Sequence, residues 1–221
     1  MIIVAVAAIL VALVQLIGPA IAAKVVEGKV RKYGTVKSVT VKAWPAVKLL
    51  WRDADEVDVE AGTLTLSPEQ AVSLLGEGKG TGTVHTRARA VVLGGLRLTG
   101  VRFDKYGPEL TAEGTVSEAD IAAVLPAGVT VALVGSQEGE VRVKVSGGLF
   151  GFGASVEAVA EAEDGKLVAR PVGLLGGLKL DIFESEDVKI EGVEAEALAS
   201  GGSGAEGKGR RYRLVMRARL T

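Results

Sequence analysis

The sequence predicts a mostly β protein of the α+β class, in which a long N-terminal helix and short helices pack on a highly curved antiparallel sheet. Three observations carry this prediction. Apolar and polar residues alternate along most of the chain, a helical apolar stripe precedes them, and the apolar face changes parity at glycines. The chain has 221 residues and no long linker, so we expect one domain after its apolar N-terminus.

The N-terminal segment, residues 1–23, carries no charged side chain. Ala20 and Ala22 fit the small-residue pattern of a signal-peptidase site, but the run is also long enough for an uncleaved anchor that spans a bilayer. A buried core helix is the third interpretation. No basic residue precedes the run, and the basic residues that follow it favour retention inside the cell. Because apolar leaders of this kind usually direct export, we expect residues 1–23 to be a signal peptide or membrane anchor and 24–221 to form a single extracytoplasmic domain.

The first helix of the body is marked by apolar residues at spacings of three and four, among them Val26 and Val30, and Gly34 is expected to end it. Two shorter helices are predicted by capping boxes that begin at Ser67 and Ser117. Each of these short helices has aliphatic residues on one side, so each is expected to cover a sheet edge or end.

Strands with one buried and one solvated face are predicted where apolar residues recur at every second position. The clearest of these segments are residues 57–61, 84–92, 110–116, 141–145 and 212–220. The apolar parity changes after Gly62 and again after Gly100, which indicates bulges or sharp bends. Strands bent in this way are typical of a strongly twisted or coiled sheet.

Composition argues against several classes of function. The net charge of −1 gives no bulk attraction to nucleic acid. The chain has no cysteine and one histidine, His85, which is too few for a His-dependent triad or a His-rich metal site. The densest acidic cluster, Asp181 to Asp187, is interpreted as solvated loop charge, with calcium binding as the lesser alternative. We therefore expect no enzyme, no metal and no cofactor.

Three surface features each allow two interpretations. The segment from Trp44 to Trp51, which includes Leu49, either packs in the core or faces lipid. The glycine-flanked Leu149, Phe150 and Phe152 form either an aromatic turn or a tip that dips into lipid. Arginines of the last strand, including Arg211 and Arg213, either meet anionic headgroups or guard a solvated sheet edge.

The order of features resembles the LmeA-like phospholipid-binding family of actinobacteria. The resemblance rests on residues 34–41, the Trp44-Pro45-Ala46 segment, and residues 54–61, 95–103 and 115–121. The aromatic-Pro-aromatic motif of the family ends here in the small Ala46. The resemblance implies a periplasmic protein that binds phospholipid, notably phosphatidylinositol, and supports lipoglycan maturation. It also implies a fold similar to the tubular lipid-binding proteins, with an apolar groove between a long helix and a curved sheet.

We therefore expect an exported phospholipid-binding protein of the cell envelope that holds acyl chains in an apolar groove and meets the membrane surface. The expected lipid contacts are Val26, Val30, Trp44, Leu49, Trp51, Leu149, Phe150 and Phe152, and the expected headgroup contacts are Arg211 and Arg213. Two other functions stay open on the sequence alone. One is a membrane-tethered structural or assembly module, and the other is an envelope enzyme with a carboxylate pair.

Overall fold

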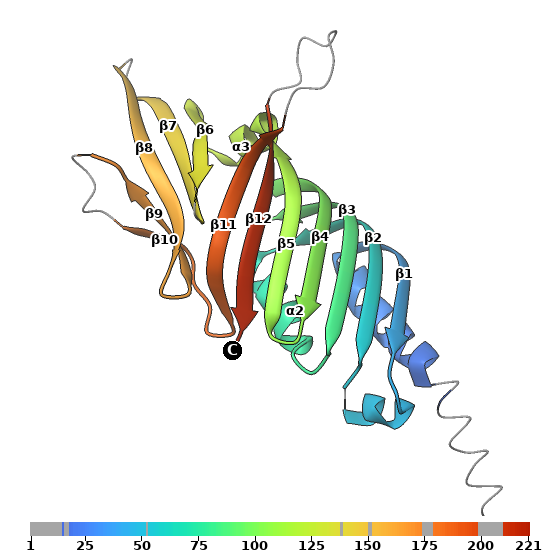
Figure 1. Cartoon of the computed structure of the whole chain (residues 1–221). Helices are drawn as coiled ribbons and strands as arrows, with labels where there is room; N and C mark the ends of the chain where they lie inside the picture. Colours follow the sequence, from blue (N-terminus) through green and yellow to red (C-terminus); the bar gives the residue numbers. More distant parts are fainter. Residues whose placement is uncertain are drawn as a thin grey trace, which may run out of the picture.

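The computed structural model describes residue 15 and residues 18–51, 53–137, 139–149, 152–173, 179–198 and 210–221. Strands make up 61% of the described residues. They form a seven-stranded and a five-stranded sheet that stand side by side (Figure 1). The prediction of an α+β protein that is mostly β is confirmed.

The seven-stranded sheet holds, in spatial order, β1 (Gly34–Lys42), β2 (Glu56–Leu66), β3 (Thr83–Leu93), β4 (Leu96–Tyr106), β5 (Glu109–Ser117), β12 (Arg211–Leu220) and β11 (Val188–Leu198). All its pairs are antiparallel except β2 with β3. Helix α2 (Pro68–Glu77) lies between these two strands in the chain and returns it to the end of the sheet where β2 began. The prediction of an antiparallel sheet is confirmed except at this one parallel pair.

The five-stranded sheet holds β10 (Leu180–Phe183), β9 (Lys166–Pro171), β8 (Phe152–Glu163), β7 (Glu140–Leu149) and β6 (Val129–Gln137), all antiparallel. It packs against β11, where the Ala195 amide donates to Ser136 Oγ at 3.0 Å. The strands are thus divided between two sheets, neither of them strongly curled. The single highly curved sheet and its tubular shape are not confirmed.

The described helices are short. Residues 18–30 are helical and run into the 3₁₀ turns of η1 (Arg31–Tyr33), while η2 (Ala46–Trp51) links β1 to β2. A long N-terminal helix is not confirmed. Gly34 follows η1, as the sequence predicts, and a Cβ there would lie 1.9 Å from the Thr63 carbonyl oxygen, so no larger residue fits.

Both predicted capping boxes are present. Ser67 caps α2 and Ser117 caps α3 (Glu118–Val124), and in each the third helical residue, Gln70 or Asp120, bonds back to the cap. The predicted parity changes coincide with irregular pairing. The β4–β5 register shifts between Thr99 and Arg102, around Gly100 at φ +60°. The β1–β2 register shifts where Val36 meets Ala61, next to Gly62.

Candidate functional site

The apolar face of the seven-stranded sheet is covered most tightly near its two edges. At one edge Val41, Val57 and Val59 are buried. At the other, the buried cluster holds residues of β11, β12 and β5: Val188, Ile190, Val193, Ala218, Leu220 and Leu110. The middle strand, β4, has no buried apolar side chain at all. In most sheets the middle strand is the most buried, because edge strands border solvent. In this sheet the middle strand is instead less buried than the strands near the edges.

The partly covered surface between the two edges is apolar. We call it the central strip, and it consists of six half-buried residues: Leu98, Val101 and Phe103 of β4, Ala112 of β5, and Leu214 and Met216 of β12. Register places them on one face, since Phe103 pairs with Ala112 and Ala112 with Met216. A Cβ on Gly114, which pairs with Leu214, would touch Val101 at 3.3 Å and Leu98 at 3.6 Å.

The elements around the central strip cover it loosely. Helix 18–30 packs on the β1–β2 edge through Ala22, Ala23, Val26 and Val30. The second sheet packs on the β11 edge through Val141, Ala162 and Leu167. Between them, α2 contributes Leu75 to the β11 cluster and α3 contacts β4 and β5, yet neither helix has a fully buried residue. Elements with so few buried side chains open at a low free-energy cost.

One cation lies on this apolar face. Lys105 of β4 is 2% exposed, and its ammonium group donates to the Thr81 carbonyl oxygen. Desolvation lowers the pKa of Lys105 below its usual value, because an ammonium group loses hydration when it is buried. The sequence analysis missed this residue. The signal was present, since Lys105 continues the parity of the inward-facing Val101 and Phe103.

The predicted lipid contacts are spread over several places. Val26, Val30 and Leu49 are half-buried and pack beside β1 and β2. Trp44 is 73% exposed, so its packing in the core is ruled out, whereas contact with lipid stays a prediction. The structure does not bring these residues onto the central strip.

Other predicted contacts lie at the limits of the described structure. The side chains of Trp51, Leu149 and Phe152, and the whole of Phe150, lie outside the described residues. The backbones of Leu149 and Phe152 pair at the end of the β7–β8 hairpin, which agrees with the predicted turn. Whether this turn meets lipid stays a prediction.

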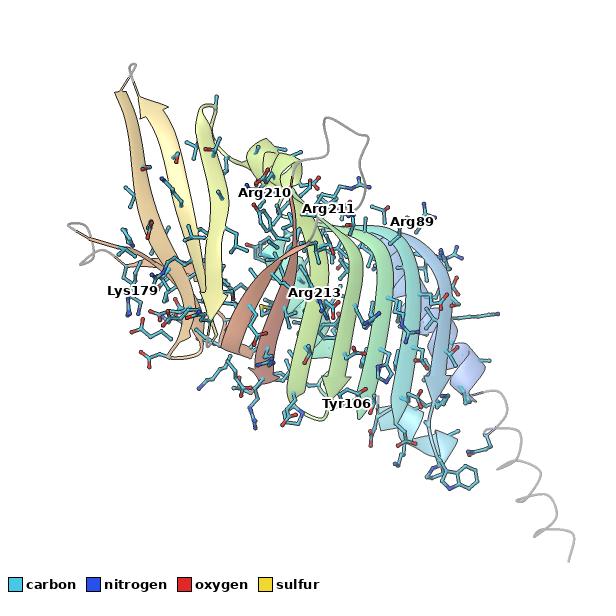
Figure 2. The ribbon with its side chains drawn as sticks, turned by 45° about the horizontal axis from the view of Figure 1, so that its top comes forward. Arg89, Tyr106, Lys179, Arg210, Arg211 and Arg213 are labelled. Carbon is cyan, nitrogen blue, oxygen red and sulfur yellow. The ribbon has the colours of Figure 1, made fainter. Side chains whose placement is uncertain are left out.

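The two predicted headgroup residues lie on the face of the sheet away from the central strip. On β12, exposed Arg211 and Arg213 alternate with Tyr212 and Leu214 of the apolar face (Figure 2). Arg213 donates two hydrogen bonds to the carboxylate of Glu113, at 3.0 and 2.9 Å. These two hydrogen bonds are the main reason why the pKa of the Glu113 carboxyl lies below its usual range. Further along β12, Arg217 and Arg219 pair with Glu194 and Glu191 of the neighbouring β11.

The other polar groups of interest also have partners. His85 Nδ1 lies 2.5 Å from Asp104 Oδ1, and its ring meets Tyr106 edge-on with centroids 5.3 Å apart. The His85 side chain is half-buried on its strand. In the acidic cluster, Lys166 binds Asp181 and Glu184, and Lys79 binds Asp187.

The part of the chain that the structure describes contains neither a metal-binding cluster nor a membrane-spanning helix. No group of three or more His, Cys, Asp or Glu residues is placed to hold a metal ion there. No helix among the described ranges has the length and apolar character needed to cross a membrane.

A family model described as LmeA-like phospholipid-binding matches residues 11–206, which include helix 18–30, the whole central strand β4 and all of the second sheet. The match ends before β12. Neither the curated proteins nor the solved structures give a match.

Proposed function

Because the chain belongs to the LmeA-like phospholipid-binding family, we propose that it is an exported protein of the cell envelope that binds phospholipid acyl chains along the central strip. One observation carries the site. The apolar residues of β4 stay half-exposed in the middle of the sheet, while both flanking clusters are fully buried. A protein that keeps apolar surface open to water at its centre gains stability from a ligand that covers it.

The driving force for binding is the transfer of methylene groups out of water. Each CH₂ buried contributes about 0.8 kcal/mol, and the central strip offers aliphatic side chains and a single aromatic ring, Phe103, as partners. Flexible acyl chains suit such a surface, because the unbranched side chain of Met216 adjusts its rotamers to many chain shapes.

Entry of a lipid requires the cover of the strip to move. We assign that movement to α2 and α3, which pack with half-buried side chains only. The contact between Leu75 of α2 and the β11 cluster is the one that has to give way first, since Phe103 of the strip packs against the same cluster.

The proposal extends to the lipid headgroup and to the biological role. We propose phosphatidylinositol as the lipid and a part in lipid transport or lipoglycan maturation, as the resemblance implies. Of the two arginines, Arg211 is the better candidate for a headgroup at the membrane surface, because Arg213 is already bound to Glu113. No specific observation favours a carboxylate-dependent enzyme, since three of the four clustered acids bind lysines.

The experiment is extraction of the purified protein with organic solvent, followed by mass spectrometry, together with binding of the lipid-free protein to phosphatidylinositol vesicles. We expect a co-purified phospholipid and saturable binding. If the extract holds no lipid and the vesicles bind no protein, the proposed function fails.

A further inference from the structure

Lys105 of β4 places a positive charge inside the apolar face of the seven-stranded sheet. Its side chain is 2% exposed. Its partners in register are Leu110 of β5, which belongs to the buried cluster at the β11 edge, and Val84 of β3, which packs on the cluster at the β1–β2 edge. The lysine therefore lies between the two buried clusters that flank the central strip.

The ammonium group of Lys105 has more hydrogen-bonding capacity than the described residues use. It carries three N–H donors, and among those residues it donates to one acceptor, the Thr81 carbonyl oxygen. No described carboxylate pairs with it, and desolvation lowers its pKa. Burial of a charge without a counter-charge is costly. A neutral side chain that ends in an N–H group can make the same bond to Thr81 without that cost, so this bond alone does not account for a lysine.

The charge lies at one end of the central strip. Along β4 the inner face presents Leu98, Val101 and Phe103, and then Lys105. At about 3.4 Å per residue, the apolar part from Leu98 to Phe103 is about 17 Å long. The hydrocarbon core of a bilayer is about 30 Å thick, so one leaflet of acyl chains spans about half of that. The inner face thus offers an apolar length suited to one acyl chain, followed by a positive charge.

The arginines of β12 do not supply this charge. Arg211 and Arg213 lie on the opposite face of the sheet, and Arg213 is bound to Glu113. They can meet the headgroups of a bilayer, but a phospholipid whose chains lie on the central strip brings its phosphate to the inner face. Lys105 lies on that face.

We propose that the Lys105 ammonium group binds the phosphate of a phospholipid whose acyl chains extend along the central strip toward Leu98. This inference rests on the proposed binding of phospholipid at the strip, and it assigns the strip to lipids with an anionic phosphate rather than to neutral lipids. The phosphate supplies the counter-charge and the acceptor oxygens that Lys105 lacks among the described residues. Hydrogen bonds between two charged groups are stronger than those between neutral groups, and a poorly hydrated site strengthens them further.

The cover of the strip is linked to this lysine. Thr81 follows the end of α2 at Glu77, and Leu75 of α2 packs on the cluster that contains Leu110. Movement of α2 away from the sheet therefore shifts the Thr81 carbonyl group as well. The same movement that opens the strip releases the ammonium group to bind phosphate.

The test is isothermal titration calorimetry of the lipid-free protein with short-chain phosphatidylinositol and with a diacylglycerol of the same chains, which lacks the phosphate. We expect the parent to bind phosphatidylinositol about 10- to 100-fold more tightly, as is typical of hydrogen bonds to charged groups. Lys105→Met removes the charge but keeps a long side chain, and it should abolish this preference. The matched control, Lys144→Met, removes a lysine at an exposed position of β7 and should keep the preference.

Failure of this inference and failure of the proposed function give different results. If Lys105→Met prefers phosphatidylinositol as strongly as the parent does, the role of Lys105 is overturned, while phospholipid binding at the strip stands. If the parent binds neither lipid, the proposed function itself fails. Should Lys105→Met not fold, Lys105→Gln takes its place, because it keeps an N–H donor and removes the charge.

A competition experiment separates lipid phosphate from soluble phosphate. Glycerol phosphate carries the same anionic group without acyl chains, so at equal concentration it should leave bound phosphatidylinositol in place. Displacement by glycerol phosphate would show that Lys105 serves a soluble phosphate ester and would overturn its assignment to a lipid.

Discussion

Lys105 of β4 lies directly opposite Leu110 of β5, so that one buried ammonium group is set among the aliphatic residues of the sheet's inner face. Its hydrogen bond to the Thr81 carbonyl links the middle strand to the loop after α2. The buried charge of Lys105 therefore lowers stability, and it lies on the same face of the sheet as the proposed lipid site.

Replacement of this lysine by an apolar residue of similar length should stabilise the fold. We expect Lys105→Met to raise the free energy of unfolding at pH 7 by about 1 kcal/mol, because it removes a desolvated charge. Burial lowers the pKa of folded Lys105 below 10.5. The cost is therefore full below the folded pKa and fades as the pH rises toward 10.5. Urea titrations of both proteins at rising pH would show this, and a variant less stable at every pH would contradict it.

The ion pair between Arg213 and Glu113 gives the opposite dependence on pH. Hydrogen bonds from Arg213 lower the pKa of the Glu113 carboxyl from 4.5, so the stability that the pair contributes is present above pH 4.5 and is lost as the pH falls through the folded pKa. Since the pair is partly exposed, we expect Glu113→Gln to cost less than about 1 kcal/mol at neutral pH. The difference from the parent should vanish in acid, and a difference that persists there would count against this assignment.

The bulge at Gly100 offers a test of the fold. Gly100 has φ +60°, and a Cβ there would meet no atom within 4 Å, so Gly100→Ala strains the backbone without a steric clash. We expect a loss of about 1 kcal/mol in the free energy of unfolding. The control is Gly135→Ala on β6, which has equal space and no positive φ. Thermal unfolding that ranks Gly135→Ala as the more damaging change would refute the role given to Gly100.

The sequence predicts the local features of this fold well and the long-range ones poorly. Alternation marks the strands, because each has one face in the core, and Ser67 and Ser117 mark their helices through hydrogen bonds made within four residues. The parallel pairing of β2 with β3 and the insertion of β12 between β5 and β11 depend on contacts between distant segments. No local pattern encodes them.

For the candidate site, too, the local features can be predicted from the sequence and the long-range ones cannot. Parity shows that Leu98, Val101 and Phe103 belong to strands with an apolar face, but only the assembled sheet reveals that this face is left half-covered. Likewise, parity places Arg213 on the solvated side, but its bond to Glu113 needs β5 and β12 to be neighbours. The hydrogen bond from the Ala46 amide to Gln15 Oε1 could not be predicted, because it joins an apparent leader to a loop that lies far along the chain.

The location of the body can be measured directly, since the chain has no cysteine. We expect Ser155→Cys, at an exposed position of β8, to react in intact cells with a maleimide that cannot cross the cytoplasmic membrane. Reaction only after the cells are broken would contradict export, and a maleimide that does cross the membrane serves as the control for thiol access.

Binding along the central strip is tested most directly by filling the strip and counting the bound lipid. Ala112→Trp adds a large ring between Phe103 and Met216, while the control, Thr111→Trp, adds the same ring on the exposed opposite face. With folding verified for both, mass spectrometry of solvent extracts should find phospholipid lost from Ala112→Trp and retained by Thr111→Trp. Equal lipid content in the two variants would contradict the account.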